Sequence, residues 1–105
     1  MTEAEWQRQV LALAERHGWR SMHVRRSQAR AGRWSTTTSV AGWPDLLLWR
    51  PGRVVAAELK AENGALSLAQ RAVLDELAEA GLEVHVWKPS DLDEVLAVLT
   101  AEVAA

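Results

Sequence analysis

Two acidic residues and a lysine occupy positions in this sequence where they could hold a divalent cation beside a phosphate. Residues 45–60 consist of two apolar runs separated by Pro51-Gly52, and that pair predicts a two-residue turn between two strands. With this turn, Asp45 lies opposite Glu58 in an antiparallel pair, with Cβ atoms roughly 4.5–5.5 Å apart. Lys60 points to the same side as Glu58, because side chains alternate along a strand.

Two carboxylates at this separation repel each other unless a cation or a proton lies between them. Hard oxygen ligands beside an ammonium group suit Mg²⁺ or Mn²⁺ and the chemistry of phosphates. Two alternatives stay open at this point. A Glu-x-Lys pair on a strand is commonly a solvated, salt-bridged surface, and a one-residue bulge near the turn would shift the register.

Neighbouring residues extend the pattern. Gly42-Trp43-Pro44-Asp45, Glu58-Leu59-Lys60 and Gln70 follow one another in this order. The set resembles the core motif of the PD-(D/E)XK nuclease superfamily and, more narrowly, the VRR-NUC family, over about residues 3–99. The resemblance implies an α/β fold with a restriction-endonuclease-like core, in which a mixed β-sheet is flanked by helices in the order α-β-β-β-α-β-α.

The resemblance also implies roles for individual residues. Asp45, Glu58, Lys60 and Gln70 are expected to be catalytic. A Mg²⁺ (or Mn²⁺) ion is expected to be held by Asp45, Glu58, the main-chain carbonyl of Leu59 and an acidic residue of the first helix. Glu3 is preferred to Glu5 for that last place, because Glu3 shares the apolar stripe of its helix with Trp6.

Hydrophobic periodicity predicts the elements that position these residues. Helices are expected over residues 3–17, from Ser67 to before Gly81, and from Ser90 to about Leu99. Strands are expected over residues 19–24, 45–50, 53–60 and 83–88. The buried stripe of the second helix is predicted to comprise Leu68, Ala72, Leu74 or Val73, Leu77 and Ala78. Ser67 and Gln70 also match a capping box, which is the purely structural explanation of Gln70.

Basic residues are concentrated in the first half of the chain. Residues 1–53 carry nine Arg and four acidic residues, a net charge of +5, whereas residues 54–105 carry three basic and ten acidic residues, a net charge of −7. Residues 25–41 show no apolar period, and they are expected to form a loop that contacts DNA phosphates and stacks on a base. The residues expected to do so are Arg25, Arg26, Arg30, Arg33 and Trp34. A plain flexible loop beside acidic, solvated helices is the alternative.

Composition limits the remaining possibilities. One domain is expected for residues 1–105, and the absence of Cys excludes a disulfide framework and a Cys-based metal site. No apolar run approaches the ~20 residues of a membrane span, and a cytoplasmic location is expected.

The resulting hypothesis is a metal-dependent DNA endonuclease. Family resemblance favours branched DNA, as for a Holliday-junction resolvase, and a homodimer, with Trp34 and Trp43 as candidates for the interface. The alternatives are a non-specific or single-strand nuclease and a DNA-binding module with an idle site.

Overall fold

The computed structural model describes residues 1–24, 26–28, 34–36 and 40–102. Within these ranges the α-helices are α1 (Glu3–Arg16), α2 (Leu68–Glu79) and α3 (Leu92–Thr100), and a short 3₁₀ helix, η2 (Pro89–Asp91), precedes α3. The strands are β1 (Arg20–His23), β2 (Arg26–Gln28), β3 (Trp34–Thr36), β4 (Leu46–Arg50), β5 (Arg53–Leu59) and β6 (Glu83–Trp87). None of the helices in the described ranges is long and apolar enough to cross a bilayer.

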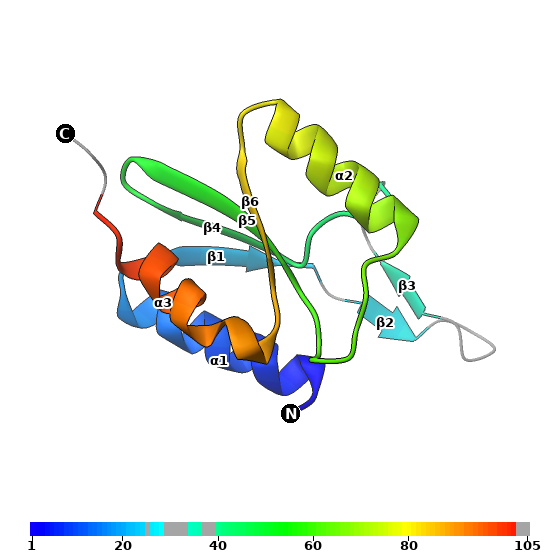
Figure 1. The fold of residues 1–105 in the computed structure, drawn as a ribbon, viewed down its shortest axis with the longest axis horizontal. Coiled ribbons are helices and arrows are strands. Elements are labelled where there is room, and N and C mark those ends of the chain that lie inside the picture. The colour runs from blue at the N-terminus through cyan, green and yellow to red at the C-terminus, as the bar shows by residue number, and fades with distance from the viewer. Residues whose placement is uncertain (25, 29–33, 37–39, 103–105) are drawn as a thin grey trace.

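A mixed four-stranded sheet with the order β1-β4-β5-β6 organises the chain (Figure 1). The pairs β1–β4 and β4–β5 are antiparallel, whereas β5 and β6 are parallel. Two parallel strands require a crossover connection, and α2 supplies it. The predicted α/β fold, with helices flanking a mixed sheet in the order α-β-β-β-α-β-α, is confirmed.

The central hairpin has the predicted register. Arg50 pairs with Arg53 and Leu46 pairs with Ala57. The residues between them pair one to one without a skipped position, so the β4–β5 ladder contains no bulge. Gly52 has φ +82°, a conformation that glycine adopts without steric cost at a tight turn. Asp45, the residue before β4, therefore reaches the level of Glu58 at the far end of the hairpin.

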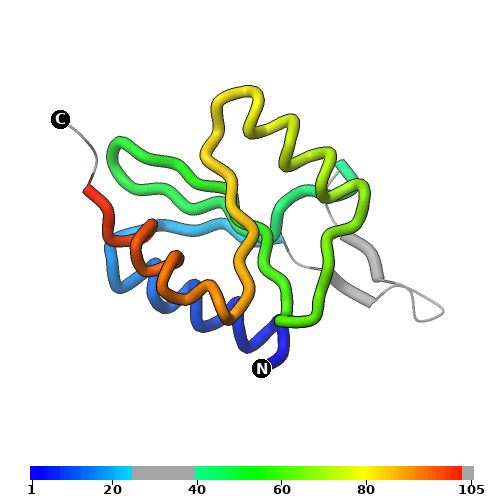
Figure 2. Tube along the Cα trace, viewed as in Figure 1, coloured from blue at the N-terminus to red at the C-terminus, as the bar shows by residue number. Residues whose placement is uncertain are grey.

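The helices cover the two faces of the sheet unequally (Figure 2). One face packs against α1 and α3, and its core includes Trp6, Val10, Leu48, Val55 and Leu99, each at most 1% exposed. The other face is covered in part by α2, which packs along β6. Burial of apolar area on the first face is the main source of stability.

Two expectations about local structure were wrong. Residues 26–28 and 34–36 form an antiparallel pair, β2–β3, where a loop was predicted; a short ladder of main-chain hydrogen bonds needs no apolar period. Leu68, Ala72 and Ala78 were predicted to lie on the buried stripe of α2, yet all three are exposed, Leu68 to 89%. The buried residues of that helix are Gln70, Val73 and Leu74, so the stripe is displaced around the helix and includes a polar residue.

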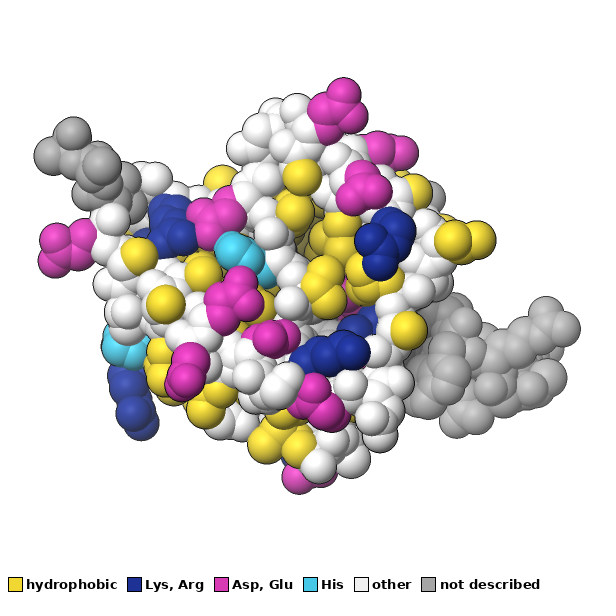
Figure 3. All heavy atoms as spheres, viewed as in Figure 1, with side chains coloured by type: hydrophobic (Ala, Val, Ile, Leu, Met, Phe, Trp, Pro, Cys, Tyr) yellow, Lys and Arg dark blue, Asp and Glu magenta, His cyan; other side chains and the backbone are white. Residues whose placement is uncertain are grey.

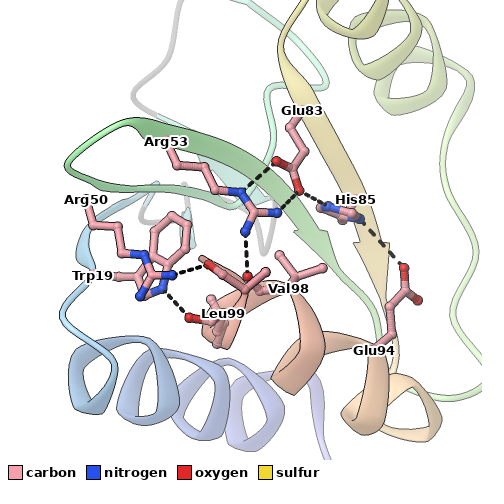
Figure 4. A network of polar contacts seen from close by, with 9 residues as sticks. Trp19, Arg50, Arg53, Glu83, His85, Glu94, Val98 and Leu99 are labelled. Carbon is pink, nitrogen blue, oxygen red and sulfur yellow. Dashed lines mark hydrogen bonds and ion pairs between the residues drawn. The ribbon is translucent and has the colours of Figure 1, made fainter. Parts of the chain in front are cut away.

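Trp19, just before β1, and two arginines of the β4–β5 hairpin bind carbonyl groups at the end of α3 (Figure 4). Trp19 Nε1 donates to the Leu99 carbonyl at 2.9 Å, Arg53 Nη1 donates to the Val98 carbonyl at 2.8 Å, and Arg50 donates to the Ala101 carbonyl. The last carbonyl groups of a helix have no partner within it, and cations are favoured at this end. These contacts therefore fix α3 onto the sheet.

Arg53 also forms a two-point ion pair with Glu83 on β6, through contacts of 2.9 and 2.6 Å. Hydrogen bonds from Arg53 hold the pKa of Glu83 below its ordinary value, and the same pair raises the pKa of Arg53. His85 Nε2 lies 2.7 Å from Glu83 Oε2. The ion pair connects the turn end of β5 to the start of the parallel strand β6.

We expect Glu83→Gln to lower the free energy of unfolding by about 1 kcal/mol near neutral pH, because the pair is only partly buried. A carboxyl group with a lowered pKa stabilises the fold above its ordinary pKa and loses that contribution as pH falls. The difference between wild type and variant should therefore vanish in acid, as followed by urea denaturation across pH. Glu94→Gln is the control, because Glu94 is 55% exposed and 3.7 Å from His85. Equal effects of both variants at every pH would contradict this account.

Candidate active site

The buried polar residues of the described ranges are the four predicted to be catalytic. Asp45 is 7% exposed, Glu58 is fully buried, Lys60 is 9% exposed and Gln70 is 6% exposed. Burying such groups costs free energy unless each finds hydrogen bonds or an opposite charge. Their gathering at the end of the hairpin beside α2 therefore needs an explanation beyond folding. The alternative of a solvated Glu-x-Lys surface is excluded by the burial of Glu58 and Lys60.

Asp45 is held by the main chain on both sides. Its carbonyl accepts a hydrogen bond from the Val24 N–H at 3.0 Å, which extends the β1–β4 ladder by one step. Its Oδ2 accepts from the Leu59 N–H at 3.0 Å, so the carboxylate itself extends the β4–β5 ladder. The side chain is thereby fixed beside β5, at the level where Glu58 follows from the register.

Glu58 is oriented by the first turn of α2. Its Oε1 accepts from Gln70 Nε2 at 3.2 Å. The Oε1 of Gln70 accepts from the Ser67 N–H at 2.9 Å, while the Gln70 N–H donates to Ser67 Oγ at 3.1 Å. Gln70 therefore closes the capping box and, through its amide N–H, contacts the Glu58 carboxylate at the same time. The N-terminal end of a helix also favours a negative charge nearby.

Lys60 lies one residue beyond β5, on the same side as Glu58. Its N–H donates to the Trp87 carbonyl at 3.1 Å, and that carbonyl also accepts from Trp6 Nε1 at 3.0 Å. Helix α1 is thus tied to the sheet next to Lys60. The lysine side chain lines an open hollow of about 480 Å³, which Gln70 also lines.

Glu3 is placed less favourably for a role in metal binding. It is half-buried at the start of α1, while Glu5 is exposed and closes a capping box with Thr2. Hydrogen bonds from Thr2 lower the pKa of Glu5. Among the residues that the structure describes, no three His, Cys, Asp or Glu side chains gather closely enough to hold a metal. The structure therefore brings Asp45 and Glu58 together but does not add Glu3 as a third carboxylate.

Gly42 is a functional candidate to which the sequence assigned no role of its own. Its φ is +87°, and a Cβ atom at this position would lie 2.4 Å from the Ala69 carbonyl carbon and 2.7 Å from the Gln70 N. The loop that leads into Asp45 therefore packs directly on the first turn of α2. Its only signal was its place in the Gly42-Trp43-Pro44-Asp45 motif, because a backbone contact across 27 residues leaves no local pattern.

Most of the residues predicted to contact DNA lie outside the part of the chain that the structure describes. Arg25, Arg30 and Arg33 are not among the described residues, and Arg26 and Trp34 are described only as members of β2 and β3. Trp43 is half-buried beside Pro44 in the loop before β4.

A comparison with protein families gives an independent result. The family model described as the VRR-NUC domain matches residues 4–91. The chain belongs to the VRR-NUC family. This family is a PD-(D/E)XK-like nuclease domain, and the match spans α1 through η2. No curated protein matches the chain.

Membership of the VRR-NUC family indicates that the chain is a nuclease. The matched range contains Pro44-Asp45, Glu58-Leu59-Lys60 and Gln70, which the fold brings to one end of the sheet.

We expect Gly42→Ala to displace α2 from the Asp45 loop. The substitution adds a left-handed strain of about 1–2 kcal/mol and an overpacking cost of about 1–3 kcal/mol. Urea denaturation should show the summed loss of stability, and nuclease activity should fall because Gln70 moves away from Glu58.

Gly18→Ala is the matched control, because Gly18 has φ +83° and an added Cβ would meet nothing within 4 Å. This variant should show the strain alone and keep its activity. If both variants lose the same stability and both stay active, the Gly42 contact has no part in positioning the site.

Proposed function

We propose that this protein is a metal-dependent DNA endonuclease whose active site is formed by Asp45, Glu58, Lys60 and Gln70. The observation that carries the proposal is the burial of two carboxylates and an ammonium group at the end of one hairpin, with an amide fixed against one carboxylate. Membership of the VRR-NUC family supports hydrolysis of phosphodiester bonds as the reaction.

The donor set fits a Mg²⁺ or Mn²⁺ ion. Asp45 and Glu58 offer hard carboxylate oxygens, the ligands that these ions prefer, and the carbonyl of Leu59 would be a third ligand. Glu3 would contribute only through an intervening water. When bound, such an ion supplies an activated water and neutralises charge on the phosphate.

The remaining residues of the site have separate tasks. Gln70 holds Glu58 in one orientation through its amide N–H, which leaves the carboxylate less free to turn away from a ligand. Lys60 places an ammonium group where it can bind the phosphate and stabilise the charge that grows on its oxygens. A preorganised cation in a partly dry site acts more strongly than the same cation in water.

Charge on the surface indicates how DNA approaches. Acidic side chains are spread over the face formed by α2, β6 and α3, with Lys and Arg side chains among them (Figure 3). Residues 54–105 carry a net charge of −7, which disfavours the approach of a DNA backbone to this half of the chain. The Arg25–Arg33 segment and Trp34 remain the proposed phosphate and base contacts. This role rests on their sequence pattern.

The finer proposal is that the substrate is branched DNA and that the enzyme acts as a homodimer. A four-way junction offers two strands related by approximate two-fold symmetry, and a chain with one site can cut both as a two-fold dimer. This part rests on the family resemblance and on symmetry.

The test is cleavage of labelled four-way junction, flap, duplex and single-stranded DNA with Mg²⁺, Mn²⁺ or EDTA at one stated salt concentration. Wild type should cut the junction at least tenfold faster than duplex, and only with a metal. Asp45→Asn and Glu58→Gln should abolish cleavage. Each keeps an oxygen to accept the hydrogen bond from Leu59 or Gln70, and each relieves carboxylate repulsion, so the thermal midpoint without metal should stay level or rise.

Glu62→Gln is the control, since Glu62 is exposed, near Lys60 in sequence, and bonded to Ser90. It should cut like wild type. Cleavage retained by both site variants would refute the assignment. Equal rates on all substrates would refute only the preference for branched DNA and leave a general nuclease.

A further inference from the structure

The outer edge of β6 is an unpaired strand edge. β6 is the last strand of the four-stranded sheet, and no strand that the structure describes lies beyond it (Figure 1). The carbonyl of Trp87 accepts a hydrogen bond from the Lys60 N–H, so Trp87 and every second residue before it direct their main-chain groups to β5. The main-chain groups of Val84 and Val86 therefore point outward, because successive residues of a strand bond to opposite sides.

The opening at this edge is limited to those two valines. The N–H of Leu82, before β6, donates to the Leu77 carbonyl at 3.0 Å, and the N–H of Lys88, after β6, donates to Asp91 Oδ2 at 2.8 Å. The outward groups of the two valines make no hydrogen bond with the described part of the chain. Proteins commonly protect an unpaired edge with proline, lysine or a bulge, and β6, with the sequence Glu-Val-His-Val-Trp, has no proline and no lysine.

A small apolar hollow lies between this edge and α2. Val84 and Val86 line it from the strand, and Leu66 and Leu74 line it from the other side. Its volume of about 140 Å³ is well below the roughly 300–1,000 Å³ of small-ligand pockets. The hollow is therefore of a size to receive side chains of a neighbouring strand, and Val86 is 38% exposed there.

Two opposite charges on α2 line the same hollow. Arg71 and Asp75 are both exposed, and neither forms an ion pair with the described part of the chain. Helix α2 runs antiparallel to β6, because it connects two parallel strands, so Arg71 lies toward Val86 and Asp75 toward Val84. The two charged residues are about 6 Å apart along the helix, and the two valines are roughly 7 Å apart along the strand. The hollow is thus positive at one end and negative at the other.

We propose that a second copy of this chain pairs its β6 with this edge, antiparallel and around a two-fold axis at His85. In this register Val84 of each copy lies opposite Val86 of the other, and each of these two pairs exchanges two main-chain hydrogen bonds. The neighbouring registers would place a valine opposite Leu82 or Lys88, whose N–H groups already have partners. All the outward groups of the edge are satisfied only in the proposed register.

The same two-fold axis matches the charges. Because it reverses the strand direction, the positive end of one hollow meets the negative end of the other, and Arg71 of each copy lies near Asp75 of its partner. An interface between identical copies must be complementary to itself, and this edge meets that condition in hydrogen bonding, in charge and in its apolar residues. The inference rests on the homodimer of the proposed function, and it gives that dimer its interface.

The first test is the mass of the DNA-free protein by light scattering at micromolar concentration. Wild type should have twice the chain mass of 11.6 kDa. Val86→Pro should be a folded monomer, because proline there removes an outward N–H and no hydrogen bond to β5. The matched control is Ser21→Pro on the opposite edge strand, β1. The Val24 N–H donates to the Asp45 carbonyl, so the N–H of Ser21 points outward by alternation, and this variant should remain dimeric.

Charge reversal tests the register without a change in the strand. Arg71→Asp leaves two acidic residues at the hollow, and Asp75→Arg leaves two basic ones. Each variant alone should weaken the dimer by about tenfold or more, because like charges then face each other. An equal mixture of the two variants should form a heterodimer, since every contact across the axis then joins opposite charges. A role within one chain cannot produce this rescue, because each chain keeps its like charges.

The outcomes separate the interface from the proposed function. A dimer that Val86→Pro leaves intact, or a mixture of the charge variants that stays monomeric, overturns the β6 interface. A monomeric wild type that cleaves DNA with Mg²⁺ refutes the interface and leaves the nuclease. A dimer that depends on Val86 and on the charges, in a protein that does not cleave, supports the interface and refutes the proposed nuclease function.

Discussion

The placement of two carboxylates at the buried end of one hairpin is the constraint on which the rest of this structure depends. The side chain of Asp45 accepts the hydrogen bond from the Leu59 N–H that a main-chain carbonyl of the neighbouring strand would otherwise accept. The same carboxylate therefore belongs both to the β4–β5 pairing and to the site. Glu58 is fully buried and held by Gln70. Neighbouring carboxylates disfavour each other's charged form, and the proposed cation would offset that repulsion.

Several other features hold that arrangement in place. The close contact of Gly42 with Ala69 fixes the Asp45 loop to α2, and the capping box of the same helix fixes Gln70. The Trp87 carbonyl accepts hydrogen bonds from Trp6 of α1 and from the N–H of Lys60, the residue after β5. It thereby connects α1 to the end of β5. Each of these elements is therefore held near the site by at least one contact within the protein, and none of these contacts involves DNA.

The arginines of this chain serve two different purposes. Arg50 and Arg53 contribute to the positive charge of the first 53 residues, yet they cap the end of α3, and Arg53 also binds Glu83. Arg20 lies over the Trp49 ring at 5.8 Å. The basic charge available to DNA is smaller than the count suggests, and the Arg25–Arg33 segment accounts for much of what remains.

The sequence predicted the parts of the site that depend on local rules. Pro51-Gly52 set the hairpin register, the strand period placed Glu58 and Lys60 together, and the Ser67–Gln70 spacing identified a capped helix. It failed where the outcome depends on tertiary packing. The buried side of α2 includes Gln70 and leaves Leu68 exposed, which the apolar pattern alone did not predict. The contact of Gly42 is with α2, which is distant in sequence. The β2–β3 pair has no apolar period that could reveal it.

Calorimetric titration of Mn²⁺ or Mg²⁺ into the DNA-free protein tests the central claim most directly. The account predicts saturable binding at one site per chain, which disappears in Asp45→Asn and in Glu58→Gln while both variants remain folded. Binding heats that are the same in wild type and in both variants would contradict it, because the two carboxylates would then hold no cation.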